Sequence, residues 1–453
     1  YDSYYLARPY LKAIQEGKYT TRELDEKVRR VLRLFYRTTM NRHRPHGFLC
    51  SDGHYATARQ IAEEGIVLLQ NRNRVLPINT QKVRHVLVVG ENAIKMMTVG
   101  GGSSSLKVQR EISPLQGLQA RLAKDGVEVD FARGYVGDVT GAYNGVTTGQ
   151  NLEDKRSEAE LIAEAVEKAK AADCVILFGG LNKSDYQDCE GHDRQQYELP
   201  YAQDKLITAL AAANKNFVYV NISGNAVAMP WRDKVPAIVQ GWYLGSEAGE
   251  ALAAVLTGDA NPSGKLPFTW VKSLQNVGAH ALNTYPGTWR KEGGSKTEGN
   301  IIDEEYKEGI YVGYRWADRE KQRPVFAFGH GLSYTQFAIS NLRADKASMT
   351  AADSITFTVQ VKNIGQRAGS ETVQLYVHDA KASVDRPLKE LKGFCKVSLQ
   401  PGESKDVSIT LGKDALSFYD ETTASWKAEP GLFEAWVGNA SDNLKLRKSF
   451  QLK

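Results

Sequence analysis

The chain has 453 residues and a formal net charge of +5 at pH 7, and 42% of its residues are hydrophobic and 25% are charged. This length exceeds the about 250–300 residues at which a single hydrophobic core stops growing, so two to four domains are expected. Positive and negative residues are interspersed, and no apolar run approaches the roughly 18–20 residues of a membrane span, so neither a nucleic acid nor a membrane is an expected partner.

The first 45 residues are predicted to form helix followed by a linker. Thr20 and Glu23 have the spacing of a capping box, and apolar residues then recur at helical spacing up to Phe35. Residues 41–48 are basic and contain a proline and a glycine, which is typical of a linker. The chain opens with Tyr-Asp-Ser-Tyr-Tyr and lacks a methionine or a basic-then-apolar start. This opening suggests a processed or truncated chain.

Residues 46–271 alternate between helical patterns and short, mainly apolar runs. Strands are expected at 85–90, 127–131, 173–179, 217–221 and 237–240. Helices are expected at 54–70, 115–122, 158–172, 202–213 and 246–256. Continuous apolar strands separated by helices predict a mostly parallel sheet covered on both faces. The expected fold of this part is therefore α/β, with a doubly wound sheet between two layers of helices.

The remaining residues have a different rhythm. Residues 272–337 are predicted to be a long connecting segment, because their first part is polar, rich in glycine and weakly periodic. From 338 to 453, segments such as 355–361, 372–377 and 407–411 alternate with period two, and turn signals such as Pro401-Gly402 separate them. Several short alternating strands at regular spacing predict an all-β sandwich.

The cysteines and histidines give no sign of a metal or redox site. Cys50, Cys174, Cys189 and Cys395 are scattered, and no pair has C-x-x-C spacing. Cys174 lies in an apolar run and is expected in the core. The sequence does not select a disulfide pairing, and the histidines show no metal-ligand spacing. Neither a metal nor another cofactor is expected.

The segment richest in titratable residues follows the apolar run 173–179. Between Lys183 and Arg194 the sequence holds Asp185, Asp188, Glu190, His192 and Asp193. Ligands of open α/β sheets bind beyond the carboxyl ends of the strands, and clustered titratable groups suit proton transfer. The alternative is a solvated charged loop in which Asp193 and Arg194 form a surface pair.

Two other loops also follow expected strands. One contains Gly101, Gly102, Ser103 and Ser104, but it matches neither G-x-G-x-x-G nor a P-loop, so a nucleotide site is disfavoured. A loop that lines a pocket is the favoured interpretation, and a plain flexible loop is the alternative. The other is Ser223-Gly224-Asn225, where the serine lacks a G-x-S-x-G context and suits a cap or turn.

Several motifs together resemble glycoside hydrolase family 3. Gly180-Leu181-Asn182, Glu190-Gly191-His192-Asp193-Arg194 and Glu198-Leu199-Pro200 are similar to the family's acid/base loop. Further matches follow in the family's order at 239–249, 261–267, 306–315 and 328–335, and residues 62–77 resemble the start of its second domain. The matches cover almost the whole chain.

The resemblance implies a parent enzyme with an N-terminal (β/α)₈ barrel, an α/β sandwich and a fibronectin-III-like domain. Residues 1–45 would then be the last helix of the barrel and a linker. The family retains anomeric configuration, and its nucleophile is an aspartate of the barrel, usually in Ser/Thr-Asp-Trp context. This sequence has no such tripeptide. The resemblance therefore implies that the chain carries the acid/base half of the site without the nucleophile.

The resemblance assigns the general acid/base role to Glu190, with Asp188 as the fallback. Residues expected to support it are Asp188, Asp193, Arg194 and His192. Burial or a neighbouring anion, with Asp188 and Asp193 as candidates, is expected to raise the pKa of Glu190. Asp193 and Arg194 are expected to pair and fix the loop.

The expected activity is that of an exo-acting β-glucosidase that releases terminal non-reducing β-D-glucosyl residues. A β-xylosidase and a non-catalytic structural or carbohydrate-contacting unit are the alternatives. The expected partners are a β-linked oligosaccharide or glucoside and the barrel of the same enzyme, and a homodimer is left open. A periplasmic or secreted location is expected from the resemblance alone.

Overall fold

The computed structural model describes residues 8–98, 106–137, 149–190, 193–290 and 301–453. It divides into two compact units, Tyr1–His54 and Tyr55–Lys453. Among the described helices, none is long and apolar enough to cross a membrane.

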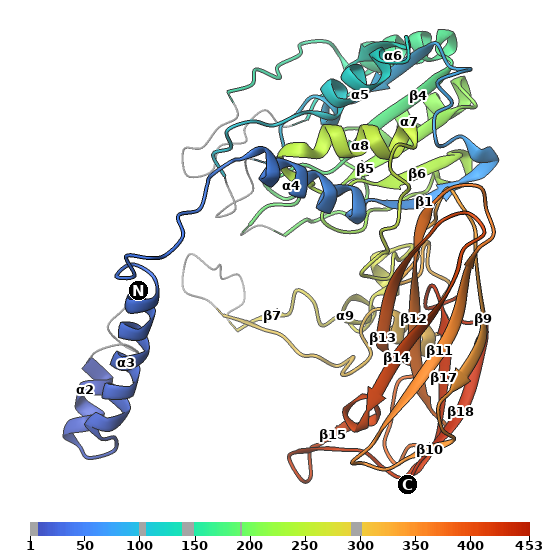
Figure 1. Ribbon diagram of the computed structural model, residues 1–453. Helices are drawn as coiled ribbons and strands as arrows, with labels where there is room; N and C mark the ends of the chain where they lie inside the picture. Colours follow the sequence, from blue (N-terminus) through green and yellow to red (C-terminus); the bar gives the residue numbers. More distant parts are fainter. Residues whose placement is uncertain (1–7, 99–105, 138–148, 191–192, 291–300) are drawn as a thin grey trace. The chain divides into compact units, whose positions relative to one another are not determined.

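The first unit contains two helices, α2 (Arg8–Gln15) and α3 (Thr21–Arg37) (Figure 1). The predicted capping box is confirmed: the Thr20 side chain accepts a hydrogen bond from the backbone of Arg22, and the Thr20 backbone donates to Glu23. Along α3 the apolar residues Leu24, Val28, Val31, Leu32 and Phe35 are exposed. The helix therefore has an amphipathic pattern whose apolar face is not covered by the described residues of its own unit.

The second unit contains all but the first three residues of α4 (Asp52–Gly65), followed by a six-stranded sheet. The sheet has the order β1-β6-β5-β4-β2-β3. Its strands are β1 (Val67–Asn71), β2 (His85–Val89), β3 (Glu128–Ala132), β4 (Cys174–Gly180), β5 (Phe217–Ile222) and β6 (Ala237–Gln240). All neighbours are parallel except β1, which is antiparallel to β6 at the edge. The predicted mostly parallel sheet is confirmed.

One prediction in this region was wrong. Residues 66–70 were expected to continue the helix that begins near residue 54, but they enter the edge strand β1. Ile66 to Leu69 are all buried. Four consecutive buried positions suit a strand covered on both faces, whereas one face of a surface helix buries only every third or fourth residue.

Helices cover both faces of the sheet, as expected for a doubly wound domain (Figure 1). On one face, α5 (Pro114–Ala123) and α8 (Ala248–Thr257) share a hydrophobic cluster with α4. On the other face, α6 (Glu158–Ala171) and α7 (Gln203–Ala213) form a second cluster. Cys174 lies in the first cluster, as predicted, and burial raises the pKa of its thiol to about 12. All four cysteines are free.

Close packing of α5 on the start of α8 requires glycine at both contact points, which gives a first testable prediction. A Cβ atom at Gly249 would lie 2.1 Å from the Ser113 carbonyl oxygen, and one at Gly117 would lie 2.1 Å from the Gly249 oxygen. Gly249→Ala is expected to lower the free energy of unfolding by about 1–3 kcal/mol, because the backbones must separate. Denaturant unfolding measures this change. Gly412→Ala, where nothing lies within 4 Å, is the matched control. Equal stability of both variants would contradict the tight contact.

The connecting segment is less irregular than the sequence suggested. Within residues 272–337 the structure has the short elements α9 (Gly278–Ala281), β7 (Thr288–Trp289), β8 (Ile302–Asp303) and α10 (Tyr314–Arg319). Ion pairs join this segment to the following domain, with Arg315 on Glu390 at 3.0 Å and Asp318 paired with Lys389. The segment therefore packs against that domain as well as linking it to the α/β sheet.

The C-terminal part is a β-sandwich, as predicted. One sheet has five strands in the order β10-β18-β17-β12-β13, and the other has three in the order β14-β11-β9. The strands are β9 (Phe337–Ala344), β10 (Ser348–Met349), β11 (Ser354–Asn363), β12 (Gly369–Asp379), β13 (Glu390–Leu399), β14 (Ser404–Gly412), β17 (Gly431–Gly438) and β18 (Leu446–Leu452). A separate hairpin consists of β15 (Phe418–Asp420) and β16 (Ser425–Lys427). Buried residues alternate along β11, which places one face in the core between the sheets.

A histidine where the two halves of this unit meet gives a second prediction. His330 Nε2 lies 2.9 Å from the Leu69 carbonyl oxygen, and burial lowers the pKa of its imidazole. As the pH falls through about 6.5, the unfolded chain therefore takes up this proton before the folded chain does. The free energy of unfolding is therefore expected to fall as the pH is lowered from 7.5 to 5.5. The loss should be smaller in His330→Gln, because glutamine takes up no proton and its amide can still donate to Leu69. Unfolding free energies of both proteins at pH 7.5 and 5.5 measure the difference, and equal losses would contradict it.

Candidate functional site

The candidate site lies where the strand order of the α/β sheet reverses. β2 pairs in parallel with β3 on one side and with β4 on the other. The carboxyl ends of β2 and β4 therefore diverge into separate loops at this edge. Ligands of open α/β sheets bind in the crevice that such a reversal creates. The loops to consider are Glu91–Lys95 after β2 and Leu181–Arg194 after β4.

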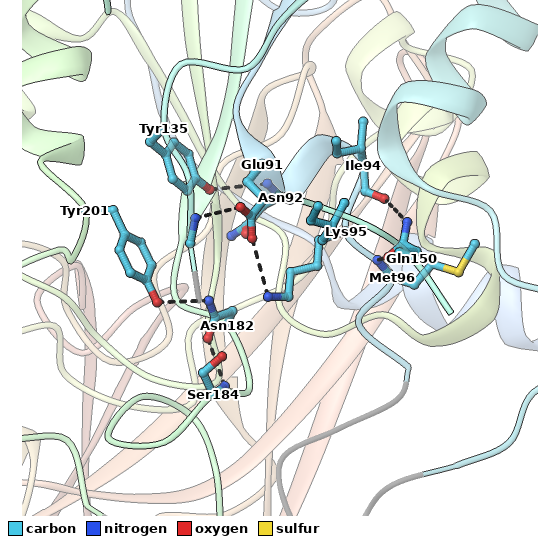
Figure 2. A network of polar contacts seen from close by, with 12 residues as sticks. Glu91, Asn92, Ile94, Lys95, Met96, Tyr135, Gln150, Asn182, Ser184 and Tyr201 are labelled. Carbon is cyan, nitrogen blue, oxygen red and sulfur yellow. Dashed lines mark hydrogen bonds and ion pairs between the residues drawn. The ribbon is translucent and has the colours of Figure 1, made fainter. Parts of the chain in front are cut away.

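A buried ionic network holds the loop after β2 (Figure 2). Glu91 is 1% exposed, and its carboxylate accepts hydrogen bonds from Arg133 at 2.7 Å and from the Gly137 backbone at 2.6 Å. Lys95 lies 3.4 Å from the other oxygen of Glu91. Arg133 also donates to the Leu152 carbonyl oxygen at 2.7 Å. Buried charges in this arrangement are paired and hydrogen-bonded, so they fix the loop geometry.

Asn92 joins this network to the end of β4 (Figure 2). Its side-chain amide donates to the carbonyl oxygens of Gly179 and Leu181 at 3.1 and 3.0 Å. Its backbone N–H donates to the Tyr135 hydroxyl, which in turn donates to the Phe178 carbonyl oxygen. The two loops at the strand reversal are therefore held together by side chains, independently of the strand pairing.

The first half of the loop after β4 is folded back on itself. The Asp188 backbone N–H donates to the Asn182 carbonyl oxygen at 3.1 Å, and the Asn182 backbone N–H donates to the Gln187 side chain at 2.9 Å. The side chains of Asn182 and Gln187 both donate to the Tyr201 hydroxyl. Residues 182–188 therefore form a compact turn that rests on the start of the next helix.

Asp188 ties the end of this turn to the two neighbouring strands. One of its oxygens accepts hydrogen bonds from the Gly224 backbone at 2.7 Å and from the Tyr243 hydroxyl at 2.9 Å. The other oxygen accepts from the Asn225 side chain at 3.0 Å. Gly224 follows β5 and Tyr243 follows β6. With three donors on it, Asp188 is committed to the acceptor role, which disfavours it as a proton donor to substrate.

Glu190 lies directly after this anchored turn, and its side chain is exposed. Beyond it, Asp193 accepts a hydrogen bond from the Tyr285 hydroxyl, and Arg194 donates to the Ala226 carbonyl oxygen at 2.7 Å. The expectation that Asp193 and Arg194 pair with each other was wrong, because these two contacts hold them to separate segments. The physical reason is tertiary: Tyr285 and Ala226 are brought to the loop from elsewhere in the fold.

The cations of this loop are partly desolvated. Burial lowers the pKa of Lys183, and the nearby carboxylates of Glu111 and Asp188 act in the opposite direction. Burial also lowers the pKa of Arg194. The Tyr243 hydroxyl has its pKa raised well above the ordinary value, first by burial and then by the charge of Asp188. The negative charge of Asp188 therefore acts on Lys183, Arg194 and Tyr243 together.

Some predicted site residues lie outside the described residues. Gly101, Gly102, Ser103 and Ser104, the predicted pocket loop, are among them, and so is His192. Among the residues that the structure describes, no group of three or more His, Cys, Asp or Glu side chains is placed to hold a metal ion.

The sequence did not point to Glu91, Arg133 or Tyr243 as parts of this site. Glu91 and Arg133 come from loops 42 positions apart, and no spacing rule relates them. Tyr243 lies in the segment 239–249, whose match to the family assigned no role to any single residue. The available signal for Tyr243 was an aromatic residue shortly after a strand of the parallel sheet, at the edge where ligands bind.

Comparison with known families agrees with this geometry. The profile described as Glycosyl hydrolase family 3 C-terminal domain matches residues 66–314. The profile described as Fibronectin type III-like domain matches residues 371–441. The first match covers the whole α/β sheet and both loops of the candidate site, and the second falls within the β-sandwich.

Individual relatives are longer than this chain. A β-glucosidase of Bacteroides ovatus is 46% identical across 100% of the chain, which corresponds to 59% of that protein. An exo-α-(1→6)-L-arabinopyranosidase of Bifidobacterium breve is 33% identical over 95% of the chain and 53% of its own length. The crystal structure of a β-glucosidase from Bifidobacterium adolescentis superposes with a TM-score of 0.82 and 32% identity over 98% of the chain and 60% of that structure. The chain thus spans a little over half the length of these relatives.

Proposed function

The chain belongs to glycosyl hydrolase family 3, and from that premise we propose that it is the acid/base-bearing part of a retaining, exo-acting β-glucosidase. Relatives named β-glucosidases support the substrate class. The observation that carries the proposal is the position of Glu190: an exposed carboxyl group, at the strand reversal, with anchored residues on both sides.

Retaining hydrolysis uses two carboxyl groups about 5–5.5 Å apart. One attacks the anomeric carbon and forms a glycosyl–enzyme bond. The other first protonates the departing glycosidic oxygen and then removes a proton from the attacking water. We assign this second role to Glu190. The nucleophile lies in a part of the enzyme outside this chain, consistent with the greater length of the relatives.

The exposure of Glu190 fits a site that is completed by another domain. A carboxylic acid that donates a proton near neutral pH needs a raised pKa, from burial or from a neighbouring anion. Asp188 turns both oxygens towards donors of this chain, so it is poorly placed to be that anion. We propose that the missing domain supplies both the burial and, as its nucleophilic carboxylate, the neighbouring negative charge.

The substrate preference remains part of the proposal. A relative named as an arabinopyranosidase indicates that different sugars are hydrolysed on this framework. A β-xylosidase is therefore the second candidate, and a purely structural or carbohydrate-contacting unit is the third. The hydrogen bonds that anchor Asp188 and Arg194 favour catalysis over a purely structural role, because a catalytic carboxyl group must be placed precisely.

Activity of the isolated chain against that of the complete enzyme tests the proposal. The substrates are the 4-nitrophenyl β-glucoside, β-xyloside and α-L-arabinopyranoside. We expect the 453-residue chain alone to release no 4-nitrophenol from any of them. The complete enzyme is expected to favour the β-glucoside. Release of 4-nitrophenol at turnover rates by the chain alone would contradict the division of the site. A complete enzyme inactive on all three would contradict the glycosidase assignment.

A further inference from the structure

The strand-following turn at residues 223–226 contacts the acid/base loop on both sides of Glu190. The Gly224 backbone and the Asn225 side chain donate to Asp188, two positions before Glu190. The Ala226 carbonyl oxygen accepts from Arg194, four positions after it. Because both flanks rest on one short turn, the position of Glu190 depends on that turn.

A fully buried polar network makes this turn rigid. Asn221, Ser223 and Gln240 are all 0% exposed. The Asn221 side chain donates to Ser223 Oγ and to Gln240 Oε1, both at 2.7 Å, and Ser223 Oγ donates to the Asn225 carbonyl oxygen at 2.7 Å. The Gln240 amide donates to the Ser223 carbonyl oxygen at 2.8 Å. A satisfied buried network has one low-energy arrangement, so the donors that face Asp188 are held in place.

From this geometry we propose that Asp188 is the positioning residue of the acid/base, acting through the turn 223–226 and Tyr243. This inference rests on the proposed function of Glu190 and adds a role for a neighbouring carboxylate that does not touch the substrate. Asp188 is hydrogen-bonded to the rigid sheet edge, and only Cys189 separates it from Glu190. An error of about 1 Å in the position of a catalytic group can cost about 100-fold in rate.

Asp188→Asn is the sharpest variant, because it preserves shape and exchanges one acceptor oxygen for an N–H donor. If the new NH₂ group faces Gly224, it meets a backbone N–H that can only donate. If it faces Asn225, the Asn225 amide must turn over to accept from it, and in either orientation Gly224, Tyr243 and Asn225 lose a charged acceptor. In the complete enzyme we expect kcat/KM for a poor-leaving-group substrate, phenyl β-glucoside, to fall about 10- to 100-fold. For 2,4-dinitrophenyl β-glucoside, which needs little acid assistance, we expect a fall of less than about threefold.

Tyr243→Phe removes one of the three donors and is expected to show the same leaving-group pattern with a smaller loss. Glu167→Gln is the control, because it neutralises an exposed carboxylate on α6 that has no part in the acid/base loop. It is expected to leave both substrates unaffected. A merely destabilised protein loses activity on both substrates in proportion, so a loss independent of the leaving group in Asp188→Asn would overturn the positioning role.

Hydrogen exchange gives a readout that needs no catalysis. In the 453-residue chain the Gly224 amide donates to Asp188, and in Asp188→Asn we expect it to exchange about tenfold faster or more. Unchanged exchange would overturn the tether.

The two proposals fail in distinguishable ways. If Glu190→Ala in the complete enzyme shows no dependence on the leaving group, the acid/base assignment fails, whatever Asp188 does. If Glu190→Ala shows that dependence and Asp188→Asn does not, the assignment stands and the positioning role is wrong.

Discussion

Replacing Glu190 with alanine in the complete enzyme is expected to lower kcat/KM for phenyl β-glucoside by about 10²–10⁴-fold, the usual contribution of a general acid. The variant can no longer protonate the departing phenolate, whose conjugate acid is weak. The substrate 2,4-dinitrophenyl β-glucoside has a good leaving group, so its kcat/KM is expected to stay near that of the unmodified enzyme.

The second half of the reaction should also change in this variant. Without a base to activate water, the glycosyl–enzyme accumulates, so kcat and KM for the dinitrophenyl substrate are expected to fall together. A burst of dinitrophenolate equal to the enzyme concentration measures this directly. Glu167→Ala, which removes an exposed carboxylate on α6, is the control and should show normal kinetics. Equal losses on both substrates, without a burst, would remove Glu190 from the acid/base role.

Replacing Glu91 with alanine is expected to lower the free energy of unfolding of the 453-residue chain by about 3–5 kcal/mol. The change removes the carboxylate but leaves Arg133 in the interior, where its side chain is 8% exposed. A buried cation without its partner has lost both water and counter-charge. The Gly137 backbone N–H also loses its acceptor. Denaturant unfolding followed by fluorescence gives the free energies.

A second substitution separates loss of the pair from loss of volume. Glu91→Leu combined with Arg133→Met replaces both charges by apolar groups of similar size, and it is expected to be markedly more stable than Glu91→Ala. Glu167→Ala removes one partner of an exposed pair with Lys170, 2.9 Å away, and should change stability by about 0–1 kcal/mol. If Glu91→Ala behaved like Glu167→Ala, the ion pair of Glu91 with Arg133 would not be holding the site.

The sheet was predictable because most of its strands are nearly continuous apolar runs. All five expected runs became parallel strands, and the central runs 173–179 and 217–221 are the most apolar because β4 and β5 are buried on both faces. The edge strand β3 is partly exposed and alternates with Glu128 and Asp130. The prediction failed at residues 66–70, where the expected helix was continued past Glu63-Glu64-Gly65, although glycine is a common helix stop and α4 ends there. Whether such a segment forms helix or strand depends on its place in the sheet, and the local sequence pattern does not contain that information.

The site was predictable only in part. The titratable cluster after β4 showed where to look, and resemblance to a family selected Glu190 within it. The contacts that hold the loop could not be predicted, because they join residues far apart in the chain: Asp188 and Tyr243 are 55 positions apart. Asp193 and Arg194 were expected to pair because they are adjacent in the sequence. In the structure they bind Tyr285 and Ala226 instead, which are far from them in the chain.

The product that Glu190→Ala forms with azide tests the central claim most directly. Azide needs no general base, so it can attack the accumulated glycosyl–enzyme from the face that water would use. With 2,4-dinitrophenyl β-glucoside and sodium azide, the complete enzyme carrying Glu190→Ala is predicted to release β-glucosyl azide, identified by proton NMR. Release of α-glucosyl azide would mean that azide had replaced the nucleophile itself, and absence of any glucosyl azide would mean that Glu190 is not the base. Either result would contradict the account.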